Sequence, residues 1–127
     1  MEYRRIGQLS VSVIGLGCNQ IGTAYCDEVL SGQIIHEALD AGINYFDTAD
    51  EYGGNYFDLD DPSGWGRSEE YLGRALKSRR EEVVIGSKFG IYAHGDSAKG
   101  GASERWAKIA VEACNKGEFH PHRRRRK

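Results

Sequence analysis

Cysteine, proline and long apolar runs are all scarce in this sequence of 127 residues. Its cysteines are Cys18, Cys26 and Cys114, an odd set without a CxxC pair or metal-ligand spacing, which argues against a disulfide framework and fits a reducing compartment. No apolar run approaches the ~18 to 20 residues of a membrane helix, and the first residues lack the apolar stretch of a signal peptide. We therefore expect a cytoplasmic protein that does not bind a membrane.

The composition is that of one globular domain, with 39% hydrophobic and 28% charged residues. The net charge of -2 hides an asymmetry. Residues 115–127 hold six Lys or Arg against one Glu, which makes this tail +5 and residues 1–114 -7. The terminal basic run has no interleaved aromatic residues, so we expect 1–114 to fold and 115–127 to be a disordered, solvated tail without a nucleic-acid partner.

Strand-like and helix-like segments alternate along the chain. Residues 2–6 and 9–14 predict a hairpin that turns at Gly7 and Gln8. Further strands are expected over 43–48 and 83–88, and helices are expected to begin at Ser31, Ser68 and Ser103. This alternation predicts an α/β fold with a parallel sheet and right-handed crossovers.

Three chemically active side chains follow the predicted parallel strands. Asp47 and Tyr52 lie at the end of the second of these strands, and Lys88 ends the third. The carboxyl ends of parallel strands are where α/β folds place catalytic groups. A nearby ammonium makes a phenol a stronger acid, so Lys88 could tune Tyr52 to protonate a carbonyl oxygen, while Asp47 would keep Lys88 charged.

Five segments together resemble the aldo-keto reductase family: 13–18 (VIGLGC), 41–49 (AGINYFDTA), 52–53 (YG), 66–73 (GRSEEYLG) and 83–90 (VVIGSKFG). The resemblance implies a (β/α)₈ TIM barrel, NADPH as cofactor and a small-molecule carbonyl substrate. It also implies that Tyr52 is the catalytic acid, assisted by Lys88 and Asp47. Gly17, Cys18 and Asn19, with Asp47, would line the nicotinamide end of the cofactor site.

A complete barrel of this kind needs about 250 residues. We therefore expect a partial barrel here, made of the N-terminal hairpin and about three βα units. The family's catalytic histidine ends the next strand, and none of His94, His120 and His122 matches it. We expect that this chain is a truncated or frameshifted part of a longer reductase.

Three other interpretations of these residues compete with a reductase barrel. A Rossmann dinucleotide site would need a glycine where Gln20 stands and an acid ending the second parallel strand. The loop over 54–65 could line a substrate pocket, but its similarity to a calcium loop (Asp58, Asp60, Glu69) fails at Pro62 and Ser63, so no metal site is predicted. The third alternative is a non-catalytic, cofactor-binding interaction subunit like the channel-associated β subunits of the same family, or an inactive truncated product.

Overall fold

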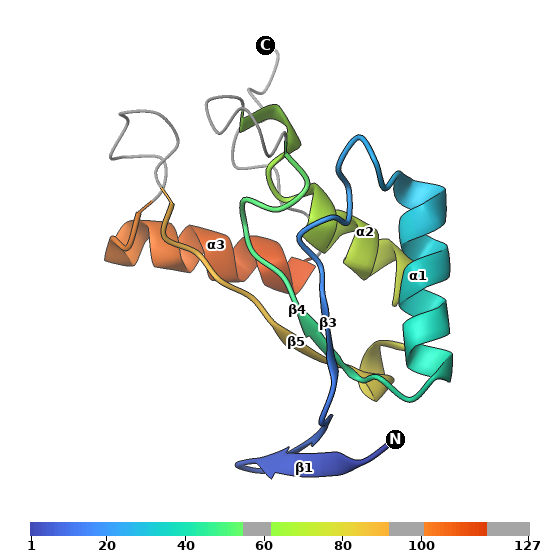
Figure 1. Ribbon diagram of the computed structural model, residues 1–127. Helices are drawn as coiled ribbons and strands as arrows, with labels where there is room; N and C mark the ends of the chain where they lie inside the picture. The colour runs from blue at the N-terminus through green and yellow to red at the C-terminus, as the bar shows by residue number, and fades with distance from the viewer. Residues whose placement is uncertain (55–61, 92–100, 117–127) are drawn as a thin grey trace.

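The computed structural model describes residues 1–54, 62–91 and 101–116. These residues form an antiparallel hairpin, a three-stranded parallel sheet and the helices that connect or follow its strands (Figure 1). In chain order the elements are β1 (Tyr3–Ile6), β2 (Leu9–Ser12), β3 (Gly15–Gly17), α1 (Glu28–Asp40), β4 (Tyr45–Asp47), a 3-10 turn (Pro62–Gly64), α2 (Arg67–Ala75), a second 3-10 turn (Arg80–Glu82), β5 (Val84–Gly86) and α3 (Glu104–Lys116). None of the described helices is long and apolar enough to span a bilayer.

The predicted hairpin is confirmed, but its second strand is shorter than expected. β1 and β2 pair in the register that joins Tyr3 to Ser12, and the turn uses Gly7 at a φ of 60°. β2 ends at Ser12, whose backbone N–H donates to the Asn44 side chain at 2.7 Å. The Ser12 hydroxyl in turn accepts from the Asn44 backbone N–H at 3.0 Å. These bonds attach the hairpin to the start of β4, and the chain then begins β3 as a separate strand.

The parallel sheet has the order β3-β4-β5. Its register places Gly17, Asp47 and Gly86 side by side. Backbone hydrogen bonds continue beyond the strand ends, from Thr48 N–H to the Gly86 carbonyl at 2.9 Å and from Asp50 N–H to the Lys88 carbonyl at 3.0 Å. The strands predicted over 43–48 and 83–88 are therefore in the right place, although the regular part of each is shorter.

Side chains alternate between the two faces of this sheet, as the pleat requires. Phe46 is fully buried on the face that α1 and α2 cover, whereas Tyr45 and Asp47 project to the opposite face. Figure 1 shows α1 and α2 packed on one side of the strands, with the hairpin beyond the end at which β3 begins. The main core between sheet and helices contains Cys18, Ile21, Cys26, Ile35, Ala38, Leu39, Phe46, Leu72, Leu76 and Val83.

The expected helix starts at Ser31 and Ser68 are wrong, each for a physical reason. α1 begins at Glu28 because Asp27 caps it, accepting from Leu30 N–H at 2.9 Å. Ser31 lies inside the helix and is fully buried. α2 begins after Gly66, at a φ of 78°, and no side chain caps it. The Ser68 hydroxyl is instead committed to buried tertiary hydrogen bonds.

The third helix begins as predicted. The Ser103 hydroxyl accepts from Trp106 N–H at 3.1 Å, and Trp106 and Ala110 are buried on one face of α3. The helix continues to Lys116, past the boundary predicted after residue 114. The rest of the predicted tail, 117–127, lies outside the described residues.

Candidate active site

Asp47 and Lys88 form an ion pair at the carboxyl end of the parallel sheet. The Lys88 ammonium donates to both Asp47 carboxylate oxygens, each at 2.9 Å, and to the Thr48 carbonyl, also at 2.9 Å. Asp47 is the last residue of β4 and Lys88 lies just beyond the end of β5, so the strand pairing itself brings them together. The two side chains predicted from separate motifs are therefore direct partners.

Tyr52 completes the predicted group. The Lys88 Nζ atom lies 4.8 Å from the centroid of the Tyr52 ring, within the range of a cation–π contact. Desolvation acts to lower the pKa of Lys88, but its hydrogen bonds to Asp47 and Tyr52 outweigh that effect, so its pKa is raised. Lys88 is consequently held as an ammonium beside the phenol ring.

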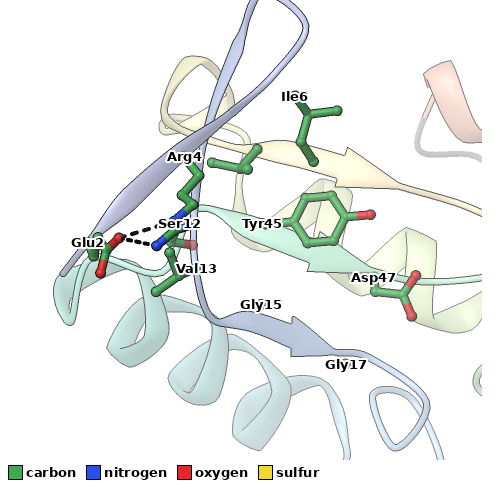
Figure 2. A pocket seen from close by; sticks show the side chains of 10 residues that line it. Glu2, Arg4, Ile6, Ser12, Val13, Gly15, Gly17, Tyr45 and Asp47 are labelled. Carbon is green, nitrogen blue, oxygen red and sulfur yellow. Dashed lines mark hydrogen bonds and ion pairs between the residues drawn. The ribbon is translucent and has the colours of Figure 1, made fainter.

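Glycines on both neighbouring strands flank Asp47 on the inner face of the sheet, which is the face opposite α1 and α2. Gly17 and Gly86 are its register partners, and a Cβ added to Gly17 would meet nothing within 4 Å. A Cβ on Gly86 would collide with the Tyr45 hydroxyl. A cavity of about 880 Å³ lies between the hairpin and the sheet. Figure 2 shows the side chains that line it, with Tyr45 and Asp47 projecting from β4. Asp47 and Gly17 border this cavity, so the site has space beside it.

The residues predicted to bind a cofactor differ in exposure. Gly17 and Asn19 are exposed, but Cys18 is fully buried, and its thiol packs in the core between sheet and helices. Burial, followed by the Asp47 charge, raises the pKa of the Cys18 thiol to about 12. The Cys18 N–H donates to the Asp47 carbonyl at 2.8 Å, and its own carbonyl accepts from Ser68. That Cys18 lines the cofactor site stays a prediction; in the structure its thiol points into the core between sheet and helices.

Asp50 is a site neighbour that the sequence argument did not single out. Its side chain is 3% exposed and accepts from the Trp106 indole N–H at 3.1 Å, while its backbone N–H binds the Lys88 carbonyl. Burial raises the pKa of Asp50 to about 6, against the lowering effect of the Trp106 hydrogen bond. Residues 47–51 contain two aspartates and one glutamate, which look equivalent in the sequence. Only tertiary packing distinguishes the buried Asp50 from the half-exposed Asp47.

Several predictions concern parts of the chain that the structure does not describe. Residues 55–61 include Asp58 and Asp60 of the pocket loop and rejected calcium site, and 92–100 include His94. In the part of the chain that is described, no three His, Cys, Asp or Glu side chains are grouped as a metal site would require.

Comparison with known proteins identifies the family. The sequence profile of the "Aldo/keto reductase family" matches residues 13–117. The chain belongs to the aldo/keto reductase family. Aldo/keto reductases are oxidoreductases that generally use NAD(P)H and act on small-molecule carbonyl compounds. This membership excludes the Rossmann alternative.

Two curated relatives and one solved structure illustrate the similarity. An uncharacterized oxidoreductase of Bacillus subtilis, YqkF, is 38% identical over 92 residues, which cover 71% of this chain and 26% of that protein. A 6-dehydroglucose reductase of Novosphingobium aromaticivorans is 34% identical over 94 residues, covering 70% of this chain and 29% of the reductase. The holo form of aldo-keto reductase AKR11C1 from Bacillus halodurans superposes with a TM-score of 0.69 at 32% identity, covering 92% of this chain and 36% of that one.

The same comparisons confirm the predicted fold class, a partial TIM barrel. The chain spans between a quarter and a third of the length of these curated relatives.

Proposed function

We propose that this chain supplies the proton-donating part of the active site of an NADPH-dependent reductase that converts an aldehyde or ketone to an alcohol. The observation that carries the proposal is the joint geometry of Lys88, its carboxylate partner Asp47 and the ring of Tyr52 at one end of the sheet. The free thiols Cys18 and Cys26 and the aldo/keto reductase membership are the support for a cytoplasmic location.

Each of the three residues has a distinct task in this mechanism. Tyr52 donates its phenolic proton to the carbonyl oxygen as negative charge develops there, which is general acid catalysis. Lys88 stabilises the phenolate that remains, because its positive charge lies beside the ring. Asp47 fixes the ammonium through two hydrogen bonds and keeps it charged during the proton transfer.

The residues present fit one end of a nicotinamide cofactor. Gly17 offers bare backbone with open space above it, next to the Asp47 carboxylate, so a flat ring could approach the sheet closely there. Exposed Asn19 would add an amide beside it. NADPH, when bound, supplies the hydride to the carbonyl carbon.

The proposal is tested in a complete barrel. Residues 1–116 would replace the equivalent segment of the Bacillus halodurans enzyme, whose solved structure sets the junction. We expect NADPH-dependent reduction of an aromatic aldehyde, followed at 340 nm. Tyr52→Phe should lower kcat by ~10² to 10⁴ because the proton donor is lost. The NADPH Kd, measured by fluorescence, should stay nearly unchanged because the ring still fills its place.

A matched control makes the same chemical change elsewhere. Tyr25 is 78% exposed and lies in the loop before α1, so Tyr25→Phe should leave kcat unchanged. Lys88→Met should cripple turnover, and Asp47→Asn should do so less severely. Near-parental turnover by Tyr52→Phe would show that the phenol is not the acid. NADPH binding without any turnover in the unsubstituted chimera would favour the non-catalytic, cofactor-binding alternative.

A further inference from the structure

The first turn of α2 lies behind the ends of all three parallel strands. The Ser68 hydroxyl donates to the Cys18 carbonyl at 3.0 Å and lies 3.1 Å from the Thr48 hydroxyl. The next residue, Glu69, accepts from the Ser87 hydroxyl at 2.5 Å. Cys18, Thr48 and Ser87 are the residues immediately after β3, β4 and β5, respectively. Two adjacent side chains of one helix therefore bind the end of every strand in the described sheet.

The same turn also holds the loop that carries Tyr52. α2 has no side-chain cap, and the backbone N–H of Ser68 donates to the Tyr52 carbonyl at 3.1 Å. N–H groups in the first turn of a helix have no partner within the helix, so a carbonyl from elsewhere is a favourable acceptor. The Tyr52 loop thus serves as part of the cap of α2, and its position depends on that helix.

This turn contacts the outer face of the sheet, which α1 and α2 cover, whereas the proposed reactive groups lie on the inner face. Consecutive residues of an extended chain point to opposite faces. Ser87 therefore points to α2 while Lys88 points to Asp47, and Thr48 contacts Ser68 while Asp47 contacts Lys88. Any shift of Ser87 or Thr48 is transmitted directly to the neighbouring residue on the inner face.

Burial of these groups is costly unless their hydrogen bonds are satisfied. Ser68 and Thr48 are fully buried, and Glu69 is 4% exposed. Burial raises the pKa of Glu69, and the hydrogen bonds from Ser87 and Cys114 oppose this rise. The location of Glu69 in the first turn of α2, at the positive end of the helix dipole, also favours the carboxylate. A neutral core residue would pack there without this cost, so the carboxylate indicates a specific task.

We propose that Ser68 and Glu69 are positioning residues, which hold the ends of β3, β4 and β5 and the Tyr52 loop so that Lys88 meets Asp47 and Tyr52. This inference rests on the proposed function of those three residues. It assigns to α2 the role of setting the geometry of the site without contact with the substrate or the cofactor.

The test measures the state of the Lys88 amine in the 127-residue chain itself. Only an unprotonated amine is acetylated, so a tightly paired ammonium reacts slowly. The chain would be treated with an acetylating ester at pH 8, and modification at Lys88 would be followed by mass spectrometry relative to Lys108. Lys108 is 71% exposed on α3 and pairs with Glu104 one helical turn away, so it serves as an internal reference.

We expect Asp47→Asn to accelerate acetylation of Lys88 by about tenfold, because a tenfold change in free amine accompanies each unit by which the pKa falls. The rate of Lys88 acetylation should also rise about threefold or more in each of the variants Ser68→Ala, Glu69→Gln and Ser87→Ala. Ser87 is exposed, so its truncation tests the contact without creating a core cavity.

A matched control separates positioning from a general loss of stability. Ser31 is also a fully buried helix serine, and its hydroxyl donates to the Cys26 carbonyl at 3.1 Å, in the loop before α1 rather than at a strand end. Ser31→Ala should leave Lys88 acetylation unchanged. Two results would overturn the positioning role alone. In the first, Ser31→Ala accelerates acetylation of Lys88 as much as Ser68→Ala, Glu69→Gln and Ser87→Ala do. In the second, those three variants leave the rate unchanged although Asp47→Asn raises it. No acceleration by Asp47→Asn would overturn the proposed site and the positioning role together.

Discussion

The buried carboxyl of Asp50 makes the stability of this chain depend on pH. Burial raises the pKa of Asp50 to about 6, from an ordinary value of 3.8. In the pH window between these values, the folded state therefore binds more protons at this group than the unfolded state does. The contribution of Asp50 to the free energy of unfolding must then fall as pH rises through that window, and the cost is fully present above about pH 6.

We predict that Asp50→Asn removes this cost. The amide oxygen can still accept from the Trp106 indole N–H, but no charge is buried. By linkage the variant should gain about 1 to 3 kcal/mol over the parent at pH 7.5 and almost nothing at pH 4. Urea unfolding at both pH values measures this difference. Asp40→Asn, at an exposed carboxylate, is the control that should show no such gain, and a constant difference between the Asp50 variant and the parent would contradict the assignment.

At the scale of elements, the helix starts show what the sequence could and could not predict. Hydrophobic spacing located α1 correctly, yet both Asp27 and Ser31 are acceptable caps, and the choice of Asp27 depends on where the preceding loop lies. At α2 the local pattern suggested Ser68 as the cap. The structure uses this hydroxyl to reach Thr48 and Cys18, and contacts separated by 20 and 50 residues have no local signature.

Two glycines, one in a loop and one in a helix, provide opposite predictions for the same substitution. Gly53 has a φ of 102°, and an added Cβ would lie 2.8 Å from the Ser68 backbone nitrogen. Gly53→Ala should therefore destabilise the chain by about 1 to 3 kcal/mol and displace the adjacent Tyr52. Gly32 lies inside α1, where an added Cβ meets nothing within 4 Å, so Gly32→Ala should stabilise it by about 0.5 to 1 kcal/mol. Thermal unfolding of both variants checks the pair, and stabilisation by Gly53→Ala would contradict the structure of the Tyr52 loop.

At the scale of the whole molecule, the site was more predictable than its surroundings. Asp47 and Lys88 follow neighbouring parallel strands, so topology alone places them at one edge of the sheet. Sequence pattern could not show that Lys88 lies over the Tyr52 ring, or that the Cys18 thiol points into the core, because one-residue changes in register or loop path reverse the direction of a side chain.

The described sheet is an open fragment of a closed architecture. Three parallel strands are present in the described residues, whereas a TIM barrel closes with eight. Apart from the buried Val11, the large apolar side chains of the hairpin and the following segment remain exposed, among them Ile6 at 59%, Leu9 at 51% and Ile14 at 56%. The Asp47 and Lys88 side chains are also nearly half exposed, so water competes for their hydrogen bonds. The geometry of the site is thus present in this chain without the enclosure that would exclude solvent from it.

We therefore predict that the 127-residue chain alone neither binds NADPH tightly nor reduces carbonyl compounds at a measurable steady-state rate. Solvent access weakens the electrostatic effect of Lys88 on Tyr52. In addition, the three described parallel strands supply only part of the barrel surface that a bound cofactor would contact. Fluorescence titration with NADPH and an aldehyde assay at 340 nm measure both properties, with the complete chimeric barrel as positive control. Aldehyde reduction by the chain alone, if Tyr52→Phe abolished it, would mean that the enclosure is dispensable and that these three strands already hold a working site.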